Sequence, residues 1–125
     1  MNNSFKKTEK LCSKTQIEEL FLNKQVVSNY PIKIFWNKTT YPNSVPVKSV
    51  ISVSKRKFKR AVDRNLLKRR IREAFRLNNN DFYETVKNKN IQLAIVIIYQ
   101  ANTKLQYSKI ENSLIIALQK LQKKL

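Results

Sequence analysis

The sequence predicts an α+β fold, in which a small mixed sheet has helices packed on it in the order α-β-β-α-β-α. Apolar residues recur at helical spacing in three stretches, near 17–21, 67–75 and 110–121. Between these helices lie stretches rich in alternating or β-branched apolar residues, which favour strands. Because 42% of the residues are hydrophobic and no linker divides the chain, we expect residues 1–125 to form a single domain.

The first predicted helix covers residues 14–22. Ser13 and Gln16 have the spacing of a capping box, and Ile17 and Phe21 lie one turn apart on its apolar face. This helix is expected to pack on the sheet.

Two strands are predicted next. From Pro31 onward, Ile32, Ile34 and Trp36 alternate with other residues, which is typical of a half-buried strand. The second strand covers about 47–54 and places on one face Val47, Ile51 and Val53.

The longest predicted helix covers about 59–77, and its two faces differ sharply. Projected at 100° per residue, its apolar residues form one stripe: Leu67, Ile71, Ala74 and Phe75. The opposite side is a basic ridge, formed by Asn65, Lys68, Arg69, Arg72 and Arg76. Arg70 borders the apolar stripe, so we expect it to have a structural role.

The last third of the chain predicts two more helices around a buried strand. Asp81 and Glu84 can cap a short helix that ends near Asn88. Residues 91–99 lack alternation, as expected of a strand covered on both faces. A final helix is expected to begin at Ser108, which has capping-box spacing to Glu111, and to bury Ile110, Leu114, Ala117, Leu118 and Leu121.

Arginine is confined to the long helix and the loop before it. All seven arginines lie between Arg56 and Arg76, whereas the nineteen lysines are scattered along the chain. Residues 55–76 hold eleven of the 26 basic residues and only two of the eight acidic ones. Most charged helix faces are simply solvated, with both signs mixed. A ridge of one sign accepts mutual repulsion, so it indicates an anionic partner such as a phosphate backbone.

Composition excludes several other classes. With no histidine and one cysteine, Cys12, the chain predicts no disulfide and no histidine or cysteine metal site, and it fits a cytoplasmic setting. Without glycine it has no P-loop or dinucleotide fingerprint, and asparagine is expected to replace glycine at turns and helix ends. The longest apolar run, 93–99, is too short to cross a membrane, and residues 1–10 are too polar for a signal peptide.

One motif is more specific than the charge alone. A strand ending in Ser-Val-Ser-Lys (52–55) is followed by Ala-Val-Asp-Arg-Asn-Leu-Leu-Lys-Arg-Arg-Ile-Arg-Glu (61–73). This arrangement closely resembles the RNR motif of the bacterial ribonuclease P protein subunit. Chain length, basic character and element order resemble that family over nearly the whole domain.

The resemblance implies a left-handed β-α-β crossover and a role in an endoribonuclease that removes the 5′ leader of precursor tRNA. In that family the RNA subunit performs the cleavage and holds most of the Mg²⁺, so no catalytic or metal-binding residue is expected in the protein. The expected partners are ribonuclease P RNA and the precursor tRNA leader. The residues expected to bind RNA are Lys55, Arg64, Asn65, Lys68, Arg69, Arg72 and Arg76.

The resemblance also implies a cleft between the first helix and the sheet, where aromatic side chains contact the single-stranded leader. Ile17, Phe21 and Phe35 match this cleft by position. Bases stack on aromatic rings irrespective of sequence, as an enzyme with many tRNA substrates requires. Ordinary core packing is an equal alternative for Phe21 and Phe35.

Three positions depart from the family pattern. Leu66 replaces the usual second arginine of the motif, and Ile17 replaces a frequent aromatic residue of the cleft. Phe58 and Lys59 stand where a glycine is frequent, so the entry into the long helix is expected to be more helical or differently angled.

Other functions are weighed against this one. A ribosomal or other structured-RNA-binding protein is the main alternative, since it too can use a basic helix. A helix-turn-helix DNA-binding module fits less well, because a strand leads directly into the arginine helix. A self-sufficient nuclease would need clustered carboxylates or histidine, and polybasic membrane binding would not need arginine concentrated on one helix.

Overall fold

The computed structural model describes residues 25–39 and 45–125. The helix predicted at 14–22, including Ile17 and Phe21, lies outside the described residues, as do its cap at Ser13 and the cysteine Cys12.

A mixed sheet of four strands forms one layer of the molecule. The sequence predicts a mixed sheet, but with three strands. Its strands are β1 (Val26–Asn29), β2 (Ile32–Thr39), β3 (Val47–Val53) and β4 (Gln92–Tyr99). They lie in the order β1-β2-β4-β3, with β2 antiparallel to both of its neighbours and β3 parallel to β4. The strand that begins at Ile32 is confirmed, and β3 ends one residue before its predicted limit.

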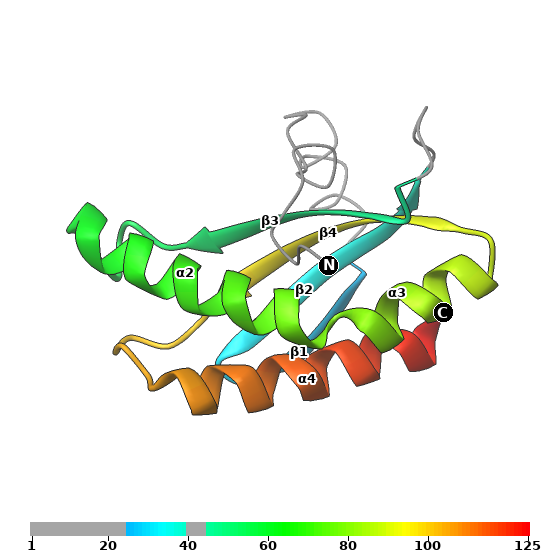
Figure 1. Ribbon diagram of the computed structural model, residues 1–125. Helices are drawn as coiled ribbons and strands as arrows, with labels where there is room; N and C mark the ends of the chain where they lie inside the picture. The colour runs from blue at the N-terminus through cyan, green and yellow to red at the C-terminus, as the bar shows by residue number, and fades with distance from the viewer. Residues whose placement is uncertain (1–24, 40–44) are drawn as a thin grey trace.

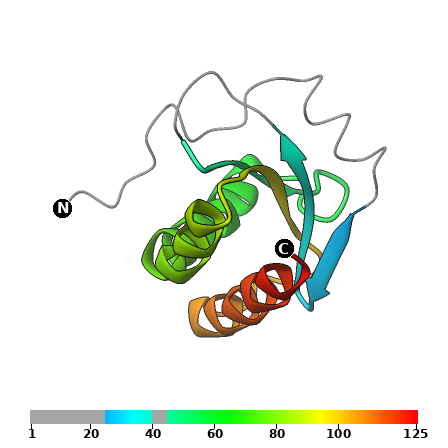
Figure 2. The ribbon, with the colours of Figure 1, turned by 90° about the vertical axis from the view of Figure 1, so that its right-hand side faces the viewer.

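Three helices cover one face of this sheet (Figures 1 and 2). They are α2 (Ala61–Asn78), α3 (Asn80–Asn88) and α4 (Tyr107–Lys124). In Figure 1, β3 and β4 run in the same direction, β4 lies below β3, and the helices lie in front of the sheet. The crossover through α2 and α3 is therefore left-handed, as the resemblance implies and against the usual preference for the right hand.

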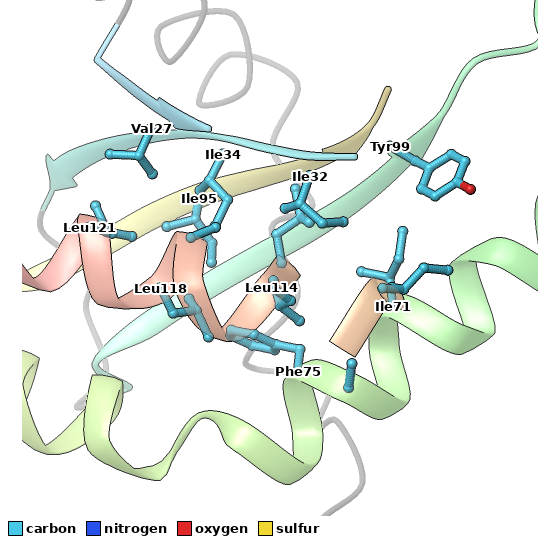
Figure 3. Close-up of a cluster of buried hydrophobic side chains, with 14 of the residues drawn as sticks. Val27, Ile32, Ile34, Ile71, Phe75, Ile95, Tyr99, Leu114, Leu118 and Leu121 are labelled. Atoms are coloured by element: carbon cyan, nitrogen blue, oxygen red, sulfur yellow. The ribbon is translucent and has the colours of Figure 1, made fainter. Parts of the chain in front are cut away.

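The main core lies between the sheet and the helices (Figure 3). Both predicted apolar stripes are confirmed: α2 buries Leu67, Ile71, Ala74 and Phe75, and α4 buries Ile110, Leu114, Ala117, Leu118 and Leu121. From β2 the alternating residues Ile32, Ile34 and Trp36 point into the same core. Because the apolar stripe of α2 is buried, the opposite side of this helix faces solvent.

β4 is covered on both faces, as its unbroken apolar sequence predicts. Ile95 and Ile97 belong to the main core. Ala94 and Val96 form a smaller cluster on the other face, against which Phe35, Val50 and Ile98 pack.

Several local details differ from the predictions. β1 was not predicted; it is only four residues long. α4 begins at Tyr107, so Ser108 lies inside the helix, and no side chain caps it. The predicted capping box is therefore wrong. α3 is confirmed, but it also lacks a side-chain cap at its start.

Asparagine takes the role of glycine at one turn, as predicted. Asn90 lies two residues after the end of α3 at Asn88 and has a positive φ of 54°. Among the described residues it alone has a positive φ. Asparagine tolerates this left-handed region better than most residues with a side chain.

Candidate nucleic-acid interface

A tight loop after β3 brings the chain into α2. The Ser54 hydroxyl oxygen accepts hydrogen bonds from the backbone N–H groups of Arg56 and Lys57, at 3.1 and 3.4 Å. Phe58 is buried, with its ring centroid 6.0 Å from that of Tyr99. The loop is therefore anchored at Ser54 and Phe58, while its lysines and arginine are exposed.

Arg64 holds this loop against the helix. Its Nη1 donates to the carbonyl oxygens of Phe58 and Lys59, at 2.8 and 2.9 Å. The helix begins only at Ala61, after Arg60 in an extended conformation with φ −83° and ψ 131°. Of the two expected outcomes, a more helical entry is wrong, because α2 begins two residues after its predicted start, while a differently angled entry stays a prediction. Arg64 is partly engaged within the protein.

The basic ridge divides into an open part and a paired part. Asn65, Arg69 and Arg72 are exposed, and Lys68 is half-buried. Among residues 25–39 and 45–125, none of these four side chains forms a hydrogen bond or an ion pair. Arg76, by contrast, forms a two-bonded ion pair with Glu73, one bond of which joins Nε to Oε2 at 3.2 Å. Its charge is partly compensated.

Lys55 lies in the exposed loop between the end of β3 and the start of α2. The open cations of the loop and of α2 therefore follow one another along the chain. A series of unpaired cations of this kind can neutralise successive phosphate groups of an RNA backbone.

The loop between β4 and α4 is fastened to this region by several bonds. Tyr99 donates through its hydroxyl to the Thr103 carbonyl (2.6 Å) and accepts from the Leu105 N–H (3.0 Å). Arg70 donates to the Leu105 carbonyl (2.7 Å), which confirms its predicted structural role. Lys57 donates to the Gln100 carbonyl (2.6 Å).

Asp63 connects the same loop to the start of α2. Its carboxylate accepts from Arg60 (3.2 Å) and from Lys104 (3.1 Å). The hydrogen bonds from Arg60 and then Lys104 hold the pKa of Asp63 below its usual value. Lys57, Arg60 and Lys104 were not among the predicted site residues, because the loop that gathers them has no sequence signature.

A shallow hollow of about 420 Å³, which we call the α2 hollow, opens beside the ridge. It is lined by Arg60, Val62, Asp63, Asn65, Leu66 and Arg69. Leu66, which replaces the usual arginine of the motif, therefore contributes an apolar surface here.

Phe35 is the only residue of the predicted leader cleft within the described part of the chain. It lies on the sheet face opposite the helices, half-buried, in the cluster with Val50 and Ile98. The Lys33 Nζ lies 5.2 Å from the centroid of its ring, within range of a cation–π interaction. This sheet face combines a cation with an aromatic ring, and it is separate from the ridge of α2.

Two further features are absent from residues 25–39 and 45–125. These residues contain no group of three or more histidine, cysteine, aspartate or glutamate side chains that could hold a metal ion. Nor do they include a helix both long and apolar enough to cross a membrane.

The fold and this surface define a small α+β domain that presents a row of unpaired cations along one helix, as a polyanion-binding protein does. Comparison with known proteins is consistent with that class. The chain belongs to the ribonuclease P protein family, whose model, described as Ribonuclease P, matches residues 5–122.

Individual relatives agree with this assignment. A Porphyromonas gingivalis protein named Ribonuclease P protein component is 25% identical over 108 residues, covering 86% of this chain and 79% of the relative. The solved structure of a Staphylococcus aureus RNase P protein is 22% identical with a TM-score of 0.70, covering 90% of this chain and 94% of that one. A mutant of the Staphylococcus aureus protein, described as defective in mRNA degradation activity, is 24% identical with a TM-score of 0.72, covering 93% and 90%. These structures share the fold.

Proposed function

We propose that the chain is the protein subunit of ribonuclease P, which binds the catalytic RNA and assists removal of the 5′ leader from precursor tRNA in the cytoplasm. The observation that carries this proposal is the row of unpaired cations on α2 in a member of this family. The RNA contacts are assigned to Lys55, Asn65, Lys68, Arg69 and Arg72, with Arg64 and Arg76 at their margin.

In this proposal the protein contributes binding and charge neutralisation, and the RNA subunit carries out the cleavage. Mg²⁺ is assigned mainly to the RNA, whose phosphates are the hard oxygen ligands that this ion prefers. Cations of α2 that neutralise RNA phosphates lower the repulsion between RNA segments and reduce the Mg²⁺ concentration needed for folding and activity.

The far face of the sheet is assigned to the 5′ leader. Phe35 offers an aromatic ring and Lys33 a cation close to it. Stacking on the ring and attraction to the phosphate are both independent of base sequence, which suits leaders of varied sequence. Phe35→Leu is expected to weaken the binding of precursor tRNA that carries a 5′ leader. Mature tRNA, which lacks the leader, should bind equally well to holoenzymes assembled with the wild-type protein and with the variant.

The decisive experiment is cleavage of a 5′-extended precursor tRNA by a bacterial ribonuclease P RNA at low Mg²⁺, with and without this protein. We expect cleavage at the mature 5′ end only when both are present. If the protein binds RNA tightly but does not assist cleavage, while the RNA alone is active at high Mg²⁺, a ribosomal or other structured-RNA-binding role replaces the proposal.

The residues are tested with a triple variant, Lys68→Ala, Arg69→Ala and Arg72→Ala, matched to a control with Lys109→Ala, Lys123→Ala and Lys124→Ala. The control removes the same number of positive charges, from three exposed lysines of α4. The α2 variant should lose affinity for the ribonuclease P RNA and reduce the slope of log affinity against log salt by about 2 to 3. An equal loss in both variants would mean that only net charge matters.

A further inference from the structure

The α2 hollow combines an apolar floor with a cationic rim. Val62 is 64% exposed, the highest value among the large hydrophobic side chains that the structure describes. Leu66 lies one turn further along the same stripe and is half-buried. Arg60, Asn65 and Arg69 complete the lining on the polar side.

This apolar stripe runs directly beside the open part of the basic ridge. Val62, Leu66 and Arg69 follow the i, i+4, i+7 spacing of one helix face. Asn65 and Arg69 belong to both the ridge and the hollow. When the phosphates of a polymer bind along the ridge, the groups attached to those phosphates therefore lie over Val62 and Leu66.

The charges of the hollow select the kind of occupant. Asp63 is already paired with Arg60 and Lys104, so its negative charge is compensated, and Arg69 leaves the rim positive. A phosphate gains nothing from the side chains of valine and leucine, whereas the face of a nucleobase packs well on an apolar surface. This surface is therefore complementary to a polyanion that also carries apolar, planar groups.

We propose that the α2 hollow receives an unpaired base of the bound RNA, with Val62 and Leu66 against the base and Arg69 on the adjoining phosphate. Asn65 is placed to hydrogen-bond an edge of that base or its ribose. The inference rests on the proposed function in taking RNA as the partner. In this proposal Leu66 makes an apolar contact with the base, whereas the arginine usual at this position of the motif would offer a charged group.

The test separates apolar contacts from charge contacts by their dependence on salt. Affinity is measured from low to moderate salt for a bacterial ribonuclease P RNA, a structured control RNA of equal length and a single-stranded oligonucleotide. Leu66→Ala should weaken RNA binding by about five- to thirtyfold at every salt concentration, so the slope stays unchanged. Arg69→Ala should instead reduce the slope by about 0.7 to 0.9.

Leu77→Ala is the matched control. Leu77, like Leu66, is a leucine of α2 outside the main core; it is 48% exposed, lies three turns from Leu66 and does not line the hollow. Alanine suits a helix interior at both positions, so both variants should fold, as circular dichroism will check. A photo-crosslinking residue, p-benzoylphenylalanine, at position 66 should attach to one RNA site, and at position 77 it should not.

The outcomes distinguish this inference from the proposed function. If the protein prefers ribonuclease P RNA but Leu66→Ala binds as tightly as Leu77→Ala, the base contact is overturned and the function stands. If it shows no preference for that RNA while Leu66→Ala still weakens binding at constant slope, the base contact stands and the function falls. Absence of binding to any of the three RNAs overturns both.

Discussion

The arginines of α2 share a residue type but differ in what their guanidinium groups reach. Arg64 and Arg70 donate to backbone carbonyl oxygens, and Arg76 pairs with Glu73. Arg69 and Arg72 remain open within the described part of the chain. The helical projection could separate Arg70 from the ridge, because that depends only on angle. It could not predict the engagement of Arg64, because that depends on the path of the preceding loop.

This difference predicts that substituting the two kinds of arginine has unequal effects on stability. Arg64→Ala removes two hydrogen bonds that hold the loop before α2, so it should lower the free energy of unfolding by about 1–2 kcal/mol. Arg72→Ala should leave it within about 0.5 kcal/mol, because no bond is lost. Urea denaturation of the two variants measures both values. An equal loss in both would contradict the structural role of Arg64.

Tyr107 predicts a dependence of stability on alkaline pH. Burial, together with its hydrogen bond to Glu111, raises the pKa of Tyr107 from 10.0 to about 12. The folded state therefore holds its proton more tightly than the unfolded chain does. This contribution to stability is complete below pH 10 and is lost as pH rises toward about 12.

Tyr107→Phe removes this titration, so unfolding free energies measured between pH 9 and 12 should fall less steeply in the variant than in the wild type. Other groups titrate in both proteins, which makes the difference between them the informative quantity. Parallel curves would contradict the raised pKa of Tyr107.

At the scale of elements, the sequence predicts well whatever depends on periodicity. The stripes of α2 and α4, the alternation of β2 and the double coverage of β4 all follow from spacing. The capping box at Ser108 is wrong because a cap also depends on the loop before it. Glu111 instead accepts hydrogen bonds from Tyr107 and Asn78, and α4 starts one residue earlier.

β1 illustrates a second limit of sequence reasoning. Its four residues are too few for a recognisable period, and its pairing with β2 supplies what the local sequence does not. Contacts from α4 add to this: Ser113 donates to the Tyr30 carbonyl, and Lys120 to that of Ser28. An element held mainly by distant residues is not visible in its own sequence.

The fastened loop between β4 and α4 gives a prediction at this scale. Tyr99→Phe keeps the buried ring but removes the bonds to Thr103 and Leu105. We expect a loss of about 1–3 kcal/mol, since two partly buried hydrogen bonds are lost together. Hydrogen exchange of residues 103–106 should accelerate more than that of β4. Unchanged exchange in the loop would show that Arg70 and Lys104 suffice to hold it.

At the scale of the whole molecule, positive charge greatly exceeds negative charge. The net charge is +18, and the structure records three ion pairs among the described residues, two of which share Asp63. Exposed pairs of this kind stabilise a fold little, because solvent screens the attraction between the two charges. Repulsion among the remaining cations therefore outweighs pairing in the free protein, and a polyanionic partner relieves it.

This imbalance predicts that salt acts in opposite directions on folding and on binding. Between 50 and 300 mM NaCl, screening of like charges should raise the melting temperature of the free protein, because the shorter Debye length weakens the repulsion between exposed cations. Over the same range the affinity for RNA should fall steeply, since releasing counterions into a more concentrated salt solution gains less free energy. Thermal unfolding followed by circular dichroism and filter binding give the two curves. A melting temperature that falls with salt would mean that the few ion pairs, rather than the repulsion, dominate the electrostatics of this fold.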